Sequence, residues 1–404
     1  MDIQNFSALF NTPARCEAFL KLIKDNKTKH IFIQGLEGSS IALFFSNLLE
    51  HKQAHIIIAN DLDEAGYLYN DLVQINGNDH ILLFPSGYKR DIKYGQPDPP
   101  SEILRTEVLN RLCQKGESLL IVTYPEAIAE KVVPVNMLSE QTLHIDKNSK
   151  CDIITLSDKL RERGFEEVDY VYEPGQFAVR GSILDVFSYT NELPYRIDFF
   201  GKEVESIRTF EVETQLSTGK LEEVYIVANV CGQEVSGISI LDFIDKNTIL
   251  ICHNLSWVID RISTIASESL SEQTLIAEEG DRYAMQKIID VTAFQKKITT
   301  FRRIDYGASS EANAPAVIRF NCAPQGVYHK NFDLVSQSFS QFIEKGYTLY
   351  ILSDSEKQIE RLQAIFEERG DSISFTPVLK TLHEGFVDND LKIGCFTDHQ
   401  IFDR

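Results

Sequence analysis

The sequence lacks several features that would place it in a familiar class. No apolar run approaches the ~18 residues that a membrane-spanning helix requires, and nothing resembles a secretory signal. The seven cysteines form no Cys-x-x-Cys pair, so neither a disulfide framework nor a zinc ribbon is predicted. An odd number of scattered cysteines favours a reduced, cytoplasmic compartment in which they are small core side chains.

Positive charge is also scarce. Lys and Arg total 40 against 60 Asp and Glu, a formal net charge of -20. Such a chain is a poor candidate for binding nucleic acid through its overall field, because phosphate neutralisation needs clustered cations. A local cluster such as Lys296, Lys297, Arg302 and Arg303 is interpreted as a solvated face rather than a DNA site. No Ser-His-Asp, Cys-His or metal-spaced constellation is present, so no catalytic or metal-binding residues are predicted.

What the 404 residues do contain is a regular alternation of buried strands and helices. Strand patterns at 31–35, 55–60, 80–85 and 118–124 alternate with helical ones, which predicts a parallel sheet covered on both faces. We therefore expect an α/β multidomain chain. Its predicted parts are the sheet domain over 1–124 and again over 213–308, an inserted α+β domain over 125–212, a linker over 309–316 and a small α/β domain over 317–404.

The first strand leads into a glycine loop, GLEGSS, at residues 35–40. A working phosphate-binding loop reads G-x-x-x-x-G-K-[ST], with Lys on the phosphates and the hydroxyl on magnesium. Here Gly35 and Gly38 are three apart, Ser39 and Ser40 follow, and no Lys lies between residues 34 and 49. We interpret the loop as degenerate and structural, although a helix N-terminus alone can attract an anion weakly.

An acidic pair after the second strand offers a second nucleotide-related alternative. Asp61 and Asp63 in IIIANDLDEA could form a magnesium-binding Walker B site. They equally suit an N-cap and a first-turn acid of the next helix. Without a phosphate-loop Lys we favour the cap.

The segment PYRIDFF, residues 194–200, is the most informative. Alternation in a strand places Tyr195, Ile197 and Phe199 on one face and Arg196, Asp198 and Phe200 on the other. In GQFAVRG, Phe177 and Val179 would point inward and Arg180 outward. If the strands are neighbours, Arg180, Arg196, Asp198 and Phe200 form one patch with the composition of a protein-binding hot spot. The alternative is that Phe200 packs under the hairpin and the charges form an ordinary cross-strand pair.

These residues carry a family resemblance. The run YEPGQFAVRGSILDVFSYTNELPYRIDFFGKEVESIRTFEVETQLS resembles the UvrB-homology region of bacterial transcription-repair coupling factors, the Mfd family. LLIVTYPEAIAEKVVP and LHEGFVDNDLKIGCFTDHQIF are similar, more loosely, to the family's segments on either side. The resemblance implies a degenerate RecA/helicase-like domain that neither hydrolyses ATP nor verifies DNA lesions. An active UvrB-like ATP-dependent helicase subunit is the alternative function, and the missing Lys argues against it.

The resemblance also implies a partner. It makes the inserted domain the surface for the excision-repair protein UvrA, with contacts at Arg180, Arg196, Asp198 and Phe200. Related proteins have a further Arg where this sequence has Glu166 and Glu167, so that contact is missing or is supplied by Arg161 or Arg163. ATP, magnesium, RNA polymerase and double-stranded DNA would be bound by domains of the full-length translocase after residue 404. We expect a monomer that recruits DNA repair to stalled transcription.

Overall fold

The computed structural model describes residues 1–25, 27–88, 98–114, 116–140, 142–147, 150–189, 191, 193–228, 237–273, 288–307 and 316–402. Nearly all of the predicted linker, 309–316, lies outside these residues. None of the helices in the described ranges is long and apolar enough to cross a membrane.

A seven-stranded, wholly parallel sheet forms the centre of the molecule. Its strands are β1 (His30–Gln34), β2 (Ala54–Ile58), β3 (Ile81–Phe84), β4 (Leu119–Thr123), β13 (Ile249–Cys252), β14 (Arg302–Gly307) and β15 (Ala316–Arg319). Their order is β15-β1-β14-β13-β2-β4-β3. Strands from the two halves of the chain therefore interleave, and the predicted parallel α/β architecture is confirmed. The likeness to RecA-type motors stays a prediction.

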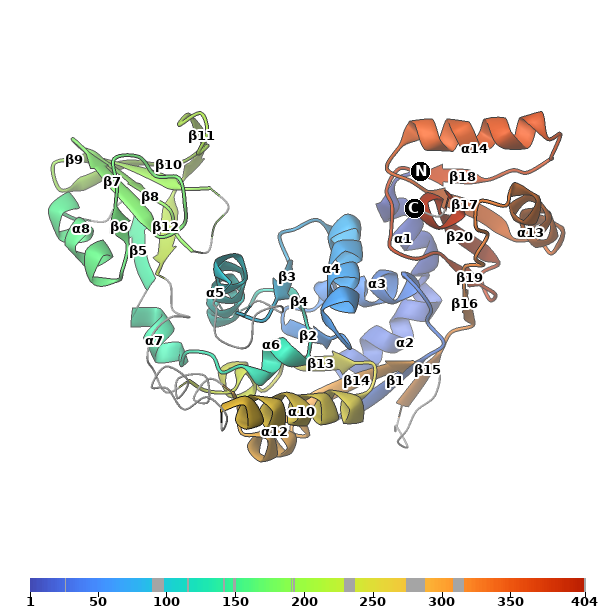
Figure 1. Ribbon diagram of the computed structural model, residues 1–404, viewed down its shortest axis with the longest axis horizontal. Coiled ribbons are helices and arrows are strands. Elements are labelled where there is room, and N and C mark those ends of the chain that lie inside the picture. The colour runs from blue at the N-terminus through green and yellow to red at the C-terminus, as the bar shows by residue number, and fades with distance from the viewer. Residues whose placement is uncertain are drawn as a thin grey trace.

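Helices cover both faces of this sheet, as α3 and α4 on one side and α10 and α12 on the other show (Figure 1). The set is α1 (Ile3–Phe10), α2 (Pro13–Lys24), α3 (Ser40–Phe45), the 3₁₀ turn η1 (Ser46–Glu50), α4 (Leu62–Asn76), α5 (Pro99–Cys113), α6 (Pro125–Ala129), α7 (Val135–Glu140), α9 (Ile240–Phe243), α10 (Leu255–Gln273) and α12 (Val291–Ile298). Local chemistry sets their ends. The Asp61 side chain accepts a hydrogen bond from the Glu64 amide at the start of α4, and Gly77 ends that helix with φ +80°. The cap interpretation of Asp61 is thus confirmed.

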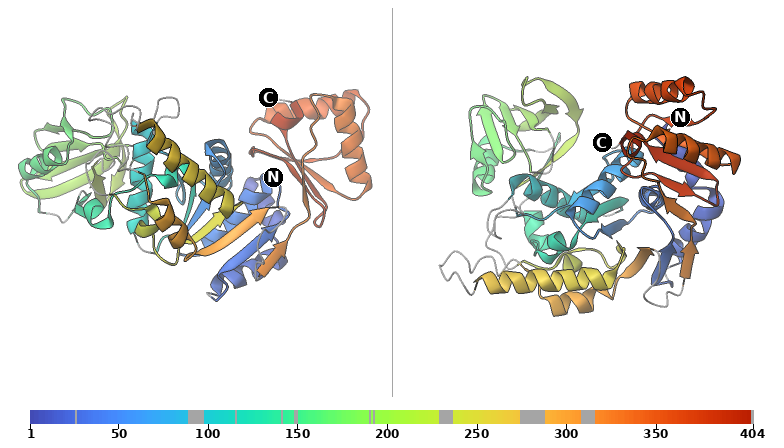
Figure 2. Two further views of the ribbon diagram at one scale, coloured as in Figure 1. Left: turned by 60° about the horizontal axis from the view of Figure 1, so that its bottom comes forward. Right: turned by 45° about the vertical axis from the view of Figure 1, so that its right-hand side comes forward.

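An insert, residues 142–228, projects from one side of this sheet unit (Figures 1 and 2). It contains β5 (Thr142–Asp146), α8 (Ile153–Glu162), β6 (Glu166–Glu167), β7 (Gln176–Arg180), β8 (Ile183–Val186), β9 (Tyr195–Phe200), β10 (Glu203–Phe210), β11 (Ser217–Leu221) and β12 (Glu223–Val227). Six strands form a sheet in the order β11-β10-β9-β8-β7-β6, and β5 pairs with β12. Just outside the insert, Val132 and Ile238 exchange two backbone hydrogen bonds of 2.8 Å, so the chain enters and leaves through adjacent segments.

The last unit, residues 320–402, lies on the other side of the sheet unit, close to the N-terminus (Figure 1). Its elements are β16 (Cys322–Pro324), α13 (Phe332–Glu344), β17 (Thr348–Leu352), α14 (Glu356–Glu368), β18 (Thr376–Val378), β19 (Phe386–Asp388), β20 (Ile393–Thr397) and α15 (Asp398–Phe402). The sheet order is β16-β19-β20-β17-β18. One side of this unit packs into the core of the sheet unit, and its other side forms a core of its own with α13 and α14. Phe6 packs on Tyr350 and Phe10 packs edge-on against Phe386.

The cores place the unit boundaries differently from the sequence prediction. The insert's main core runs from Leu143 to Ala228, whereas 125–212 was predicted. Residues of 125–138 instead pack into the core of the sheet unit, because α6 lies against α10. Strand β15, predicted to belong to the last unit, pairs with β1. Each boundary falls where a strand finds its partner, which local pattern does not reveal.

The contact between α2 and the last unit gives a first prediction. Arg15 makes two hydrogen bonds, of 2.5 and 2.9 Å, to Asp388, which is fully buried. Its guanidinium also lies 5.3 Å from the ring centres of Phe10 and Phe320. Arg15→Ala leaves a buried carboxylate without its cation and is expected to lower the free energy of unfolding by about 3 kcal/mol. Urea denaturation measures this. Lys21→Ala, at an exposed site of the same helix, should change it by less than about 0.5 kcal/mol. Equal losses in both variants would contradict the argument.

Candidate protein-docking face and the glycine loop

Strand β9 divides its side chains between two faces as the alternation predicts. Tyr195, Ile197 and Phe199 are buried in the core of the insert. Arg196, Asp198 and Phe200 point to the other face, and Phe200 is 79% exposed. A phenylalanine this exposed buries little of its surface when the chain folds. The alternative in which it packs under the hairpin is therefore wrong. A large exposed aromatic ring beside charged groups is typical of a binding surface.

A carboxylate that the sequence analysis overlooked organises this face. Asp185 of β8 lies directly opposite Arg196 in the strand register and is fully buried. It accepts hydrogen bonds of 2.7 and 2.9 Å from Nε and Nη2 of Arg196, and another from Nη2 of Arg180. The hydrogen bond to Asp185 raises the pKa of the Arg196 guanidinium. We call Arg180, Asp185, Arg196, Asp198 and Phe200 the arginine face.

Aromatic rings brace both guanidinium groups. Arg196 lies 4.4 Å from the ring centre of Phe210, and Arg180 lies 5.0 Å from that of Tyr170. Such cation–π contacts add to the charge-assisted hydrogen bonds and restrict the rotamers. Arg196 also donates to the carbonyl of Gln215 at 3.0 Å, beside exposed Leu216. The guanidinium groups are therefore held in place before any partner arrives, which reduces the entropy lost on binding.

The remaining predicted residues behave less uniformly. Asp198 accepts a 3.0 Å hydrogen bond from Ser182 and lies 3.7 Å from Arg208. Phe177 is buried as predicted, but Val179 is 37% exposed, so its inward placement was wrong. The edge strand β6 pairs only with residues 176 and 177 of β7, which leaves the sheet edge at Val179 uncovered.

The two glutamates that stand where related proteins have an Arg lie at the edge of the insert. Glu166 and Glu167 form β6 and are exposed. Arg161 pairs with Glu167 at 2.7 Å and with Asp158, while Arg163 donates to the carbonyls of Lys159 and Glu140. Both arginines that could replace the expected cation thus already have acceptors within the protein.

The basic cluster considered for DNA is dispersed by the fold. Arg302 donates to the backbone carbonyls of Leu22, Ile23, Asp25 and Thr28. Arg303 pairs with Asp305 at 2.9 Å, and Lys297 pairs with Asp242 at 3.0 Å. Three of the four cations therefore serve internal contacts, which opposes their use on a phosphate backbone.

The glycine loop, Gly35–Ser40, is closed by contacts within the protein. Gly35 and Gly38 have φ of +81° and +52°. The Ser40 hydroxyl bonds both the amide and the carbonyl of Glu37, and the Ser39 hydroxyl donates to Asp71 at 2.5 Å. Burial raises the pKa of Asp71 to about 6. Among the described residues, no group of three or more His, Cys, Asp or Glu is arranged to hold a metal ion.

An open cleft of about 520 Å³ lies beside the loop. Six carboxylates line it, from Glu37, Asp61, Asp63, Glu64, Asp71 and Glu384. A triphosphate entering this cleft would meet like charges, which repel it by Coulomb's law. The cleft therefore disfavours nucleotides for a reason beyond the missing Lys.

Comparison with known proteins shows that the insert is similar to a known domain family. Residues 143–249 match the UvrB interaction domain family. The arginine face lies wholly inside this match. The chain is also 20% identical to the transcription-repair-coupling factor of Staphylococcus epidermidis over 422 aligned residues, which cover 88% of this chain and 35% of the relative. The Staphylococcus aureus (strain MRSA252) factor is 21% identical, with 92% and 38% covered. The chain spans little more than a third of these relatives, and the resemblance seen in the sequence is confirmed.

Adjacent phenylalanines of β9 give a matched pair of variants. Phe199 is 4% exposed and Phe200 is 79% exposed. Phe199→Ala is expected to lower the free energy of unfolding by about 3–5 kcal/mol, because it leaves a cavity in the core. Phe200→Ala should change it by less than about 0.5 kcal/mol. Circular-dichroism melts compare the stability of the two variants. If Phe200→Ala unfolds the protein, the Phe200 ring is part of the core and the argument is contradicted.

Proposed function

We propose that this chain is a non-catalytic part of a transcription-repair coupling factor and that its insert recruits UvrA to sites of stalled RNA polymerase. One observation carries the proposal. Within the segment that matches the UvrB interaction domain, two arginines are fixed on one buried carboxylate beside an exposed phenylalanine. Rigid arginine and aromatic side chains are the residue types that dominate binding energies at protein interfaces.

The proposed contacts are Arg180, Arg196, Asp198 and Phe200, with Asp185 as the residue that positions the arginines. Arg180 is the more accessible cation, with 35% of its side chain exposed against 13% for Arg196. Arg180 therefore reaches a partner's carboxylate more easily, while Arg196 fixes the geometry around it. Contact with RNA polymerase and ATP-dependent movement on DNA belong, in this proposal, to other parts of a whole coupling factor.

Calorimetric titration with UvrA tests the docking face directly. Arg180→Glu and Phe200→Ala are each expected to weaken the dissociation constant about 30-fold, which corresponds to ~2 kcal/mol. Lys159→Glu and Ile154→Ala are matched controls, because both residues are exposed on α8, which covers the opposite face of the insert. Losses of equal size in the controls would contradict a localised site, and an absence of binding by the folded wild type would reject the proposal.

Asp185→Asn extends the same titration to the positioning role. The variant keeps one acceptor oxygen but leaves both guanidinium charges uncompensated. Binding should weaken about tenfold and depend more steeply on salt, because two less ordered cations would then face the partner. If Asp185→Asn instead bound UvrA more tightly than the wild type at low salt, Asp185 would only reduce the positive charge of the two arginines and would not position them.

Nucleotide binding separates this proposal from an active UvrB-like helicase subunit. Titration of the chain with ATP and magnesium at millimolar concentration is expected to give no binding signal. The reasons are the missing Lys, the closed loop and the acidic cleft. Saturable ATP binding would favour the helicase alternative. The UvrA titration tests the docking face independently of this result.

A further inference from the structure

The glycine loop is occupied by a peptide from the far end of the chain. The amide of Ser39 donates to the carbonyl of Glu384 at 3.2 Å, and the amide of Glu384 donates back to the Ser39 hydroxyl at 2.9 Å. The amide of His383 donates to Asp71 at 2.7 Å. These contacts join residues more than 300 positions apart in the sequence. A peptide carbonyl thus accepts from the loop amide, the type of donor that a phosphate oxygen uses in a working loop.

The same peptide is stacked and closely fitted. The His383 ring lies parallel to Tyr67 of α4, with ring centres 3.5 Å apart and planes 6° apart. A Cβ atom on Gly38 would lie 2.8 Å from the carbonyl oxygen of Gly385. The loop therefore needs glycine at 38 for the approach of this peptide as well as for its positive φ.

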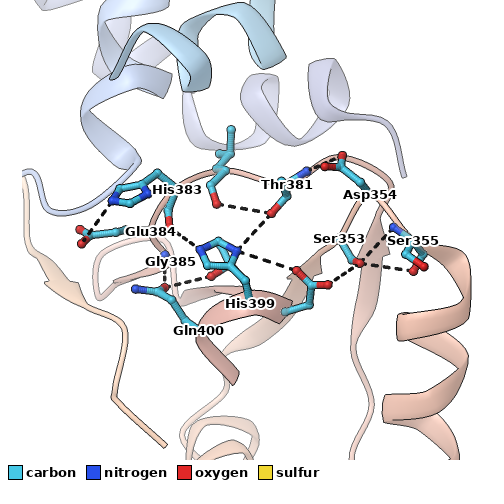
Figure 3. A network of polar contacts seen from close by, with 12 residues as sticks. Ser353, Asp354, Ser355, Thr381, His383, Glu384, Gly385, His399 and Gln400 are labelled. Carbon is cyan, nitrogen blue, oxygen red and sulfur yellow. Dashed lines mark hydrogen bonds and ion pairs between the residues drawn. The ribbon is translucent and has the colours of Figure 1, made fainter. Parts of the chain in front are cut away.

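From the other side, the last unit holds the peptide in shape. Figure 3 shows Thr381, His383, Glu384 and Gly385 between the helices of the sheet unit and the strands of the last unit. His399 bonds the His383 carbonyl at 2.6 Å, and the Gly385 amide donates to Gln400 at 2.8 Å. The Thr381 amide donates to Asp354 at 3.1 Å. The peptide is thus held by its own unit as well as by the glycine loop.

We propose that Thr381–Gly385 is a built-in peptide ligand of the glycine loop, and that the last unit serves to deliver it. We call this segment the plug. With the plug in place, the place that a phosphate would take is filled by Glu384, and the sheet unit and the last unit behave as one body. The remaining charge of the cleft is negative, which suits a peptide carbonyl and amide better than a phosphate.

Hydrogen exchange of the full chain, followed by mass spectrometry, tests the plug. Asp71→Ala removes the acceptor of the His383 amide and of the Ser39 hydroxyl. The informative probe is the Ser39 amide, whose acceptor is Glu384 and not Asp71. If the plug leaves as a unit, both the His383 and the Ser39 amides should exchange at least tenfold faster, while Gly385, bonded to Gln400, keeps its protection.

Two further variants make the outcome decisive. Asp63→Ala removes another carboxylate from α4 and the same cleft, and should leave all of these amides unchanged. Gly385→Ala should release Ser39 from the opposite side, since a Cβ there would lie 1.9 Å from Gln325 Oε1 and 2.5 Å from the Cys395 carbonyl. Protection at Ile351 of β17 reports whether the last unit stays folded. Faster exchange at His383 without any change at Ser39 in Asp71→Ala would overturn the proposal, as would an equal effect of Asp63→Ala.

Discussion

The position of β1 constrains the whole molecule. This strand lies between β14 and β15, so its partner residues come 273 and 285 positions later in the chain, as the pairs His30–Arg303 and Ile31–Ala316 show. The sheet is complete only when both later segments have returned. The insert, which lies between β4 and β13 in the chain, leaves the sheet unit and returns to it at nearly one point, where the backbones of Val132 and Ile238 pair. The insert is consequently a side branch with its own core, free to serve a partner without disturbing the sheet.

In the insert, the buried carboxylate of Asp185 organises the arginine face. A carboxylate without solvent is costly unless cations and hydrogen bonds satisfy it. Asp185 meets this condition by binding two guanidinium groups at once. The same contacts that stabilise Asp185 fix Arg180 and Arg196 at the surface. In a chain of net charge -20, this arrangement keeps two ordered guanidinium groups beside an exposed ring.

Sequence reasoning reached the parts of this arrangement that are local. Alternation along YRIDFF separated Phe199 from Phe200 because both signals lie within one strand. It missed Asp185, although a charge between Leu184 and Val186 in a strand pattern is the signal that could have found it. That Asp185 faces Arg196 depends on strand register, which is a property of two segments. The insert boundaries and the membership of β15 were misjudged for the same reason, since each depends on a distant partner.

The glycine loop illustrates the limit of reading a motif by itself. In open α/β sheets, ligands bind beyond the carboxyl ends of the strands, where loops such as this one lie. The sequence shows that the Lys of a phosphate-binding loop is absent, but it does not show which groups accept hydrogen bonds from the loop. In the structure, Ser39 is hydrogen-bonded both to Asp71 and to the backbone of Glu384. An amide that would be costly to bury unpaired is thereby satisfied within the chain. The hydrogen-bonding needs of the glycine loop are therefore met by another part of the same chain, and the shape of the loop does not depend on a nucleotide.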